Sequence, residues 1–522
     1  MSYSFSNLAI SLIEVFETQQ NQLNDEKITV NDLLSKLASW YEKFRTAMDY
    51  GSEETIPRRA IERMLKRMLF LETNSRSIAK GLVRELIWAG YFPNATVPHS
   101  LIERVANSID LHLKLKDEVT KQKVLSSDKL NEFILQILSC EIFYILLPNK
   151  EKEAVTSFMF RVLSKSIRIE DETDQTKDIQ VFLAIRKSFA KDDIAFLKYK
   201  LFTQIFGRLS DENFENVVKI FINGYKEIRF QLSYPKKERI LSHIKKVTPP
   251  FLILFELLTQ EKGNIKLLAK DQEVLKQRVF DICERKYRTI RGKIQRAIVR
   301  SFIFILFTKA IIAFAVEGAF ESIFFGRIQW LSIILNTVLP PTIMGVVGVT
   351  IRTPSEQNSQ FIFTDVQKLL FEEDPVIINA ISLTIKRKAT ASFKDYIFSA
   401  LWIFTIMLAF GIILFFLDVL HFNILSKTIF IFFIAIISFL SYRIYQTANS
   451  YTVIKKQNIL TPVFEFFFIP IIRVGRQLTE GFSQINFILL VIDFIIEAPF
   501  KGLIGFFEQW FMFVANKREE LE

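Results

Sequence analysis

The pattern of apolar residues changes character near residue 300. Before it, apolar positions recur every three or four residues, as in Leu12, Ile13 and Phe16, which is the period of an amphipathic helix. After it, the apolar residues form long runs with few charges. We therefore expect an all-α chain in which an N-terminal soluble helical domain, residues 1–275, precedes a helical membrane domain.

The runs after residue 300 predict about four transmembrane helices. They are Ser301–Phe325, Ile328–Ile351, Ile397–Leu417 and Thr428–Tyr442. Short turns join the first run to the second and the third to the fourth. The sequence therefore predicts two transmembrane hairpins, residues 301–351 and 397–447, separated by a loop at 352–396.

Residues 457–516 are apolar but differ from these spans, because the charges of each expected helix fall within a narrow arc. A broad apolar face with a thin charged stripe is typical of a helix lying in the membrane interface. We expect two C-terminal amphipathic interfacial helices. The alternative is a hairpin that re-enters or crosses the membrane with its charges buried. Arg473 and Arg476 on the first helix also permit pairing with Asp493 and Glu497 on the second.

Charge is distributed unevenly along the 522 residues. Residues 1–300 hold 50 basic and 39 acidic residues, whereas residues 301–522 hold 17 of each, so the net charge of +11 belongs to the first part. Cations flank the spans mainly before residue 301, in the 352–396 loop and just after the fourth span. By the positive-inside rule, both termini and that loop are expected to be cytoplasmic, and the protein to lie in the plasma (inner) membrane.

Residues 276–300 form a basic juxtamembrane helix with an apolar stripe. Such a segment before a span can bind anionic lipid headgroups, with each cation contributing on the order of 1 kcal/mol. The alternative is a topology signal without lipid specificity. Nucleic-acid binding is not expected, because aromatic residues are too few for a stacking platform. The candidate lipid contacts are Arg285, Lys286, Arg288, Arg291, Lys293, Arg296 and Arg300.

Motifs for catalysis are missing from the sequence. It contains no phosphate-binding loop, nucleophile elbow or zinc-binding helix motif, and Cys140 and Cys283 lie far apart. The sequence therefore offers no catalytic residue, metal site or cofactor.

Polar residues inside the first two spans are the remaining candidates for a functional site. Lys309 lies about 13 Å into the first span, where a lone charge is unfavourable and needs a partner or a wet cavity. Glu317 lies about 12 Å further along the axis, which argues against a direct bond to Lys309. Asn336 precedes Pro340 and Pro341, and such a proline pair can unwind a span at a binding site or merely kink it.

Four stretches carry a family resemblance: RRAIERMLKRMLFLE, VRELIWAGYFPN, RGKIQRAIVRSFIFILFTK and INFILLVIDFIIEAPFK. They resemble sequences of an uncharacterised class of multi-pass bacterial membrane proteins from small, AT-rich genomes. The resemblance implies a membrane protein and supplies neither an activity nor a role for any residue.

Two functions are consistent with these patterns. The first is an integral membrane protein that anchors a cytoplasmic helical protein-interaction or scaffolding module at the inner leaflet, with anionic lipids and a cytoplasmic protein as partners and homo-oligomers possible. The second is a transporter or channel for a small solute or ion, with its polar site around Lys309, Glu317 and the proline pair. An intramembrane enzyme is a third possibility, but the sequence contains no recognisable nucleophile for it.

Overall fold

The computed structural model describes residues 4–17, 25–47, 55–170, 172–268, 271–326, 330–351, 353–383, 393–453 and 468–478, with Phe506, Phe507, Trp510, Phe513 and Val514. These residues are mainly α-helical, which confirms the all-α fold. They form two compact units. We call residues 4–251 with 371–383 the N-terminal unit, and the described residues within 252–370 and 386–486 the membrane unit.

The described residues of the N-terminal unit form eleven α-helices, two short helical turns and two strands. They are α1 (Asn7–Glu17), α2 (Asp32–Ala47), α3 (Ile56–Leu71), α4 (Ser75–Trp88), α5 (Ser100–Lys121), α6 (Ser127–Leu146), α7 (Lys150–Leu163), η2 (Ser164–Ser166), β1 (Ile167–Ile169), α8 (Asp174–Ile185), η3 (Arg186–Ala190), α9 (Ile194–Phe206), α10 (Phe214–Leu232), the first part of α11 (Lys237–Gln260) and β2 (Ile381–Leu383).

Two hydrophobic cores hold this unit together, and α6 contributes to both. One core contains Leu65 of α3 and Leu82 of α4, and the other contains Phe202 of α9 and Phe221 of α10. Because both faces of α6 are apolar and covered, it is a core helix of this unit. Ile137, in the middle of α6, is fully buried.

The two strands connect distant parts of the chain. β1 and β2 pair in parallel, with Ile167 opposite Ile381 and Ile169 opposite Leu383. Next to β2, Glu373 accepts hydrogen bonds from the backbone and side chain of Asn7. The segment between the second and third expected spans therefore includes part of the N-terminal unit, which the sequence did not indicate.

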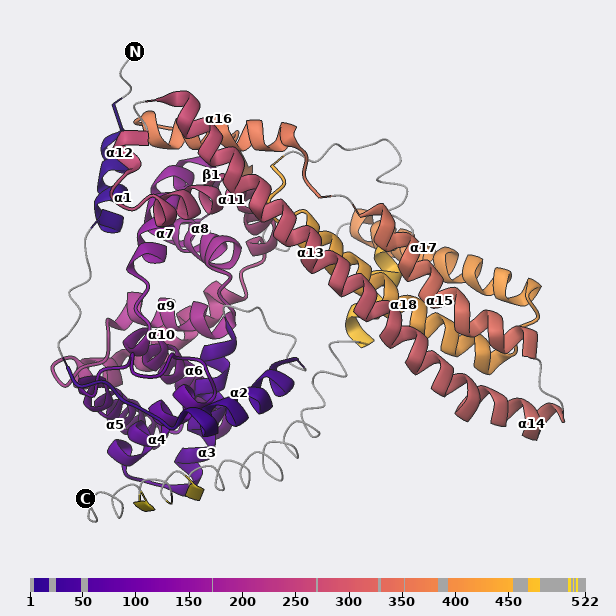
Figure 1. The fold of residues 1–522 in the computed structure, drawn as a ribbon, viewed down its shortest axis with the longest axis horizontal. Helices are drawn as coiled ribbons and strands as arrows, with labels where there is room; N and C mark the ends of the chain where they lie inside the picture. The colour runs from indigo at the N-terminus through magenta and orange to yellow at the C-terminus, as the bar shows by residue number, and fades with distance from the viewer. Residues whose placement is uncertain are drawn as a thin grey trace. The chain divides into compact units, whose positions relative to one another are not determined.

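The membrane unit contains α12 (Ile265–Leu268), α13 (Gln272–Ile312), η4 (Ala313–Gly318), α14 (Ala319–Phe325), α15 (Trp330–Thr350), α16 (Glu356–Phe371), α17 (Phe393–Val419), α18 (Ile424–Ala448) and helical residues 468–478. Among the described residues, four helices are long and apolar enough to cross a membrane, as expected: Gln272–Phe324, Trp330–Thr350, Tyr396–Val419 and Ile424–Ala448. Figure 1 shows α15 and α18 running alongside α13.

The expected basic helix and the first span form one continuous helix. α13 has 41 residues and is therefore about 62 Å long, with no break at residue 300. Its first half packs on the end of α11, where Glu256 binds Lys286 at 2.7 Å and Glu261 binds Arg278 at 3.1 Å. These ion pairs place the end of α11 in the membrane unit, so the division between the units falls near residue 251 instead of residue 275.

Helical residues 468–478 pack inside the membrane unit. Ile471 is buried in a cluster with Ala409 of α17 and Ile434 of α18. Ala435 is the twelfth residue of the 25-residue α18, so it lies about 17 Å from the start of that helix, near the middle of the span. A methyl group on Gly475 would lie 1.8 Å from the carbonyl oxygen of Ala435. Residues 468–478 therefore pack on α17 and α18, and the choice between an interfacial and a re-entrant or crossing position stays a prediction.

Glycine at position 475 permits this close approach, and its replacement tests the packing. We expect Gly475→Ala to destabilise the protein by about 1–3 kcal/mol, because the atom that the methyl group meets belongs to the backbone of α18. Gly411→Ala in α17 is the matched control, since nothing lies within 4 Å of the added methyl group there. Thermal unfolding in detergent measures both. Equal midpoints for the two variants would contradict the packing of residues 468–478 on α18.

Candidate functional site

A buried ion pair lies at the centre of the membrane unit. Lys309 of α13 donates from Nζ to Oε1 of Glu317 in η4 at 2.7 Å, and both side chains have zero exposure. The expectation that these residues lie too far apart for a direct bond is therefore wrong.

The helix geometry between the two residues explains the error. Residues 313–318 form a π-helix, in which each N–H bonds five residues back and the chain turns by less than the roughly 100° per residue of an α-helix. The smaller turn brings Glu317 close to the face that carries Lys309. Both side chains are long enough to cover the remaining axial distance. Turns of π-helix are frequent at functional sites.

Glu317 receives two further hydrogen bonds from neighbouring helices. Asn336 of α15 donates from Nδ2 to Oε2 at 2.7 Å, and Ser426 of α18 donates from Oγ to the same oxygen at 3.1 Å. Asn336 and Ser426 are also fully buried. Three donors, one of them an ammonium group, thus surround the carboxylate. We call Lys309, Glu317, Asn336 and Ser426 the polar cluster.

On one side, polar residues continue from this cluster toward the start of α18. Asn423 caps α18 by accepting from the backbone N–H of Ser426 at 2.8 Å, and it donates from Nδ2 to Oε1 of Glu321 at 2.8 Å. Glu321 is 1% exposed, so its side chain is buried within the unit. At the nearby turn, Asp418 binds Lys427.

On the other side, the cluster is closed by apolar residues. Ile305 lies one helical turn before Lys309 on α13, and Met344 and Ile437 occupy the corresponding levels of α15 and α18. All three are buried. The ring of Phe433 lies 5.2 Å from Nζ of Lys309, close enough for a cation–π contact. The buried residues on this side are mainly apolar, and Ser441 of α18 donates from Oγ to the sulfur of Met344 at 3.4 Å.

The proline pair does not unwind α15. Pro340 and Pro341 are buried within a helix that is continuous from Trp330 to Thr350. Two buried polar atoms near them make no hydrogen bond within the part of the chain that the structure describes: Oδ1 of Asn336 and Oγ of Ser332. They lie one turn apart on the same face of α15, so this is where a small polar ligand such as water would bind.

The seven candidate basic residues of α13 are exposed or half-buried, and several of them have partners within the membrane unit. Arg285 donates to Gln260 at 2.6 Å, Arg288 to Glu284 at 2.7 Å and Arg291 to Thr353 at 3.2 Å, while Lys286 binds Glu256. Lys293, Arg296 and Arg300 are exposed. They lie at i, i+3 and i+7, on one face of the helix. Binding of lipid headgroups by these residues stays a prediction.

Only half of the expected tail pairing can be located. Arg473 and Arg476 are exposed, and the guanidinium of Arg473 lies 5.7 Å from the ring centre of Trp402 in α17. Asp493 and Glu497 lie outside the described residues.

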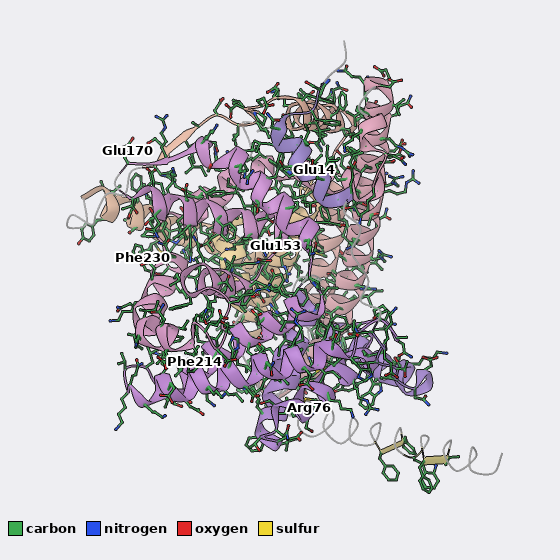
Figure 2. All side chains as sticks on the ribbon, turned by 90° about the vertical axis from the view of Figure 1, so that its left-hand side faces the viewer. Glu14, Arg76, Glu153, Glu170, Phe214 and Phe230 are labelled. Carbon is green, nitrogen blue, oxygen red and sulfur yellow. The ribbon has the colours of Figure 1, made fainter. Side chains whose placement is uncertain are left out.

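A second buried charge network lies in the N-terminal unit and was not apparent from the sequence. Arg186 opens the π-helix η3 and donates to Asp192 at 2.6 Å, Glu153 at 2.7 Å and Tyr144 at 2.9 Å. Lys200 binds Glu153 at 3.0 Å. Figure 2 labels Glu153 near the middle of the face that it shows. The network joins α6, α7, η3 and α9, which explains how it stabilises the unit.

Glu153 gives this network a pH dependence. Burial would raise the pKa of its carboxyl, but Arg186 and Lys200 outweigh burial and lower it. A lowered pKa in the folded state contributes stability above the ordinary value, and this contribution is lost as the pH falls through the folded pKa.

We therefore expect Glu153→Gln to be less stable than the original protein at neutral pH, with the difference shrinking as the pH falls below about 4. Denaturant unfolding of the two proteins across this pH range measures the difference. A difference that grows in acid would contradict the lowered pKa of Glu153.

Three sequence-selected residues, Lys309, Glu317 and Asn336, thus meet in one cluster, whereas Ser426, Asn423 and Ser332 were missed. The Asn423–Ser426 spacing at the start of the fourth span is a helix-capping signal that could have indicated two of them. Among the described residues, no three His, Cys, Asp or Glu side chains are arranged to hold a metal ion. Comparisons with protein-family models, curated proteins and solved structures find no significant match to this chain.

Proposed function

We propose that this protein is an integral membrane protein whose spans anchor a cytoplasmic helical module that binds a protein partner at the inner leaflet. The closed polar cluster carries the proposal. Lys309 and Glu317 neutralise each other with zero exposure, and apolar residues close the unit on one side of them. Such an arrangement supports a fixed packing of α13, α15 and α18 more than a route for solutes.

The strand pair supports the proposed topology. β1 belongs to the N-terminal unit and β2 to the segment between the second and third spans, so their pairing needs both on one side of the membrane. In the proposed topology the chain crosses the membrane twice between β1 and β2, so both strands lie on the same side. The excess of cations on that segment and before α13 makes the cytoplasm the proposed side.

Cysteine labelling in intact cells tests this topology. A cysteine at exposed Glu372 should resist a membrane-impermeant thiol reagent, whereas Ile424→Cys, at the 82% exposed start of α18, should react. The native Cys140 and Cys283 are buried and provide little background. Labelling of Glu372→Cys without labelling of Ile424→Cys would reverse the orientation.

Exposed apolar side chains on the N-terminal unit suggest where a protein partner binds. Phe70 and Leu71 end α3 and are 80% and 73% exposed, which is unfavourable unless another surface covers them. We expect Phe70→Ser with Leu71→Ser to leave the fold intact and to abolish growth complementation in a strain lacking the gene. Val124→Ser, at a 57% exposed position, is the control and should complement. Full complementation by the double variant would exclude this surface.

The unpaired atoms Oδ1 of Asn336 and Oγ of Ser332 favour the second candidate, transport of a small solute or ion, because they leave a polar position beside Glu317. The double variant Lys309→Met with Glu317→Gln separates the two functions, since it removes both charges and retains most of the volume. An anchor should keep full complementation at normal protein levels. Loss of complementation with an unchanged unfolding midpoint would favour transport.

A further inference from the structure

We propose that Glu317, Asn336 and Ser332 form a binding site for a monovalent cation such as Na⁺, which competes with the proton of Lys309. The site lies within the membrane unit. It supplies a ligand for the second candidate function, transport, but it depends on neither candidate, because an ion can bind in a fixed core as well as on a route for solutes. The inference begins from the two buried oxygen atoms of α15 that make no hydrogen bond within the described part of the chain.

The surroundings of Asn336 and Ser332 fix where these two oxygen atoms lie. Asn336 has zero exposure, and its Nδ2 donates to Oε2 of Glu317 at 2.7 Å and to the backbone oxygen of Ser426 at 3.3 Å. Its Oδ1 therefore faces away from both acceptors. Ser332 is 5% exposed and lies one turn earlier on the same face of α15. Buried oxygen atoms without a donor are unfavourable, so Oδ1 and Oγ indicate a ligand that donates to them or coordinates them.

The proline pair adds a third oxygen atom near this position. In an α-helix the backbone carbonyl of residue 336 accepts from the N–H of residue 340, but Pro340 has no N–H. The carbonyl of Asn336 therefore lacks its usual helical donor. Pro340 is buried as well, so bulk water does not replace this donor freely. In transporters, backbone carbonyls released from helical bonding coordinate Na⁺.

The ion pair makes this position favourable for a cation. Lys309 donates to Oε1 of Glu317, whereas Asn336 donates to Oε2. The carboxylate therefore lies between the ammonium group and Asn336, and the pair presents its negative end to the amide. A carboxylate, an amide oxygen, a hydroxyl oxygen and a backbone carbonyl are the ligands that hard cations prefer.

Charge balance requires Lys309 to respond when a cation binds. A second cation beside a fully buried ammonium group would leave an excess positive charge at zero exposure, which is unfavourable. Lys309 therefore releases one proton to solvent as the cation enters, and the total charge is unchanged. The charged side chains near the cluster are Lys309 on α13, Glu317 in η4, Glu321 on α14 and the pair of Asp418 and Lys427 at the turn before α18, while α15 carries none.

Polar residues lead to the site from the end at which α15 and α18 begin. Ser332 precedes Asn336 on α15, and Asn423 precedes Ser426 on α18, where it bonds to Glu321 at 2.8 Å. The buried residues on the other side of the cluster are mainly apolar. The cation and the released proton therefore exchange through the end that holds Asn423.

Thermal unfolding of the purified full-length protein in detergent tests the site. The midpoint should rise with NaCl and reach a plateau, relative to N-methyl-D-glucamine chloride at the same ionic strength, because a ligand that binds only the folded state stabilises it. Ser332→Ala removes one ligand and should weaken the apparent affinity for Na⁺ about tenfold. Ser441→Ala is the matched control, since Ser441 is an 8% exposed serine of α18 that bonds to Met344 on the other side of the cluster. It should keep the original affinity.

Proton release tests the competition with Lys309. NaCl added to the weakly buffered protein should release about one proton per chain, which a pH-sensitive dye measures. Lys309→Met should still be stabilised by Na⁺, and more strongly than the original protein, but should release no proton. Absence of proton release from the original protein would overturn the competition.

The comparison of salts and variants separates the cation from other occupants. Equal midpoints in the two salts would assign the position to a neutral molecule such as water and overturn the proposal. A response to Na⁺ that is identical in Ser332→Ala and Ser441→Ala would place the ion elsewhere and also overturn it. None of these measurements uses growth complementation, so their outcome is independent of the tests for anchoring and transport.

Discussion

Replacing Lys309 with leucine should lower the free energy of unfolding by about 3–5 kcal/mol, because it leaves the fully buried carboxylate of Glu317 without its cation. Asn336 and Ser426 still donate to this carboxylate, but they carry no net charge. An isolated lysine in the membrane would behave in the opposite way, since its removal relieves an unfavourable desolvation. The direction of the change therefore distinguishes a paired lysine from an unpaired one.

The double variant Lys309→Leu with Glu317→Gln is the control for this effect. It removes both charges and retains an amide that can still bond to Asn336 and Ser426, so we expect it to recover most of the lost stability. Thermal unfolding in detergent and the amount of folded protein in the membrane measure both variants. A single variant as stable as the original protein would show that the ion pair does not contribute to the packing.

The sequence predicted the four candidate spans because these depend on local hydrophobicity and length. The sequence could not predict that Lys309 binds Glu317, because the bond depends on a π-helix and no sequence motif identifies this π-helix. Ser426 was missed for a related reason, since it approaches Glu317 from the fourth span, 109 residues away. The candidate site was therefore predictable as a set of unusual residues and not as an arrangement.

The C-terminal segment, residues 468–478, shows a different limit of prediction from sequence. A narrow charged stripe on an apolar helix indicates which faces differ, but it gives no depth, so an interfacial helix and a helix packed inside the membrane share one pattern. The structure adds the packing at Gly475, whose missing side chain permits the approach to Ala435. Small residues at helix contacts are frequent in membranes, so this glycine could have favoured the packed alternative.

The spacing of apolar residues predicted that the N-terminal unit is helical. It did not predict the charge network inside this unit. Arg186, Asp192 and Glu153 each belong to sequence contexts that are typical of solvent-exposed charges. They are brought together because α7, η3 and α9 pack closely. Without these bonds, Arg186 and Asp192 would be unpaired charges in a region with little water, while Glu153 is partly exposed.

Arg186 supports the second prediction with a large effect. Its side chain is 1% exposed and bonds to two carboxylates and a phenol, so Arg186→Met should destabilise the N-terminal unit by about 3–5 kcal/mol. Lys187→Met is the matched control: Lys187 is the next residue, is 46% exposed and makes a surface ion pair with Glu238 at 3.3 Å. Its loss should cost at most about 1 kcal/mol.

The pH dependence of the Arg186→Met variant separates the loss of charge pairing from the loss of packing. Burial already raises the pKa of Asp192, with Arg186 opposing the shift, so removing the arginine should raise this pKa further. A carboxyl group whose folded pKa exceeds its unfolded pKa favours the folded state more as the pH falls through the folded value. The stability deficit of Arg186→Met should therefore shrink in acid, while that of Lys187→Met stays small throughout. Denaturant unfolding from pH 7 to pH 4 measures both, and a deficit independent of pH would attribute the effect of Arg186 to packing alone.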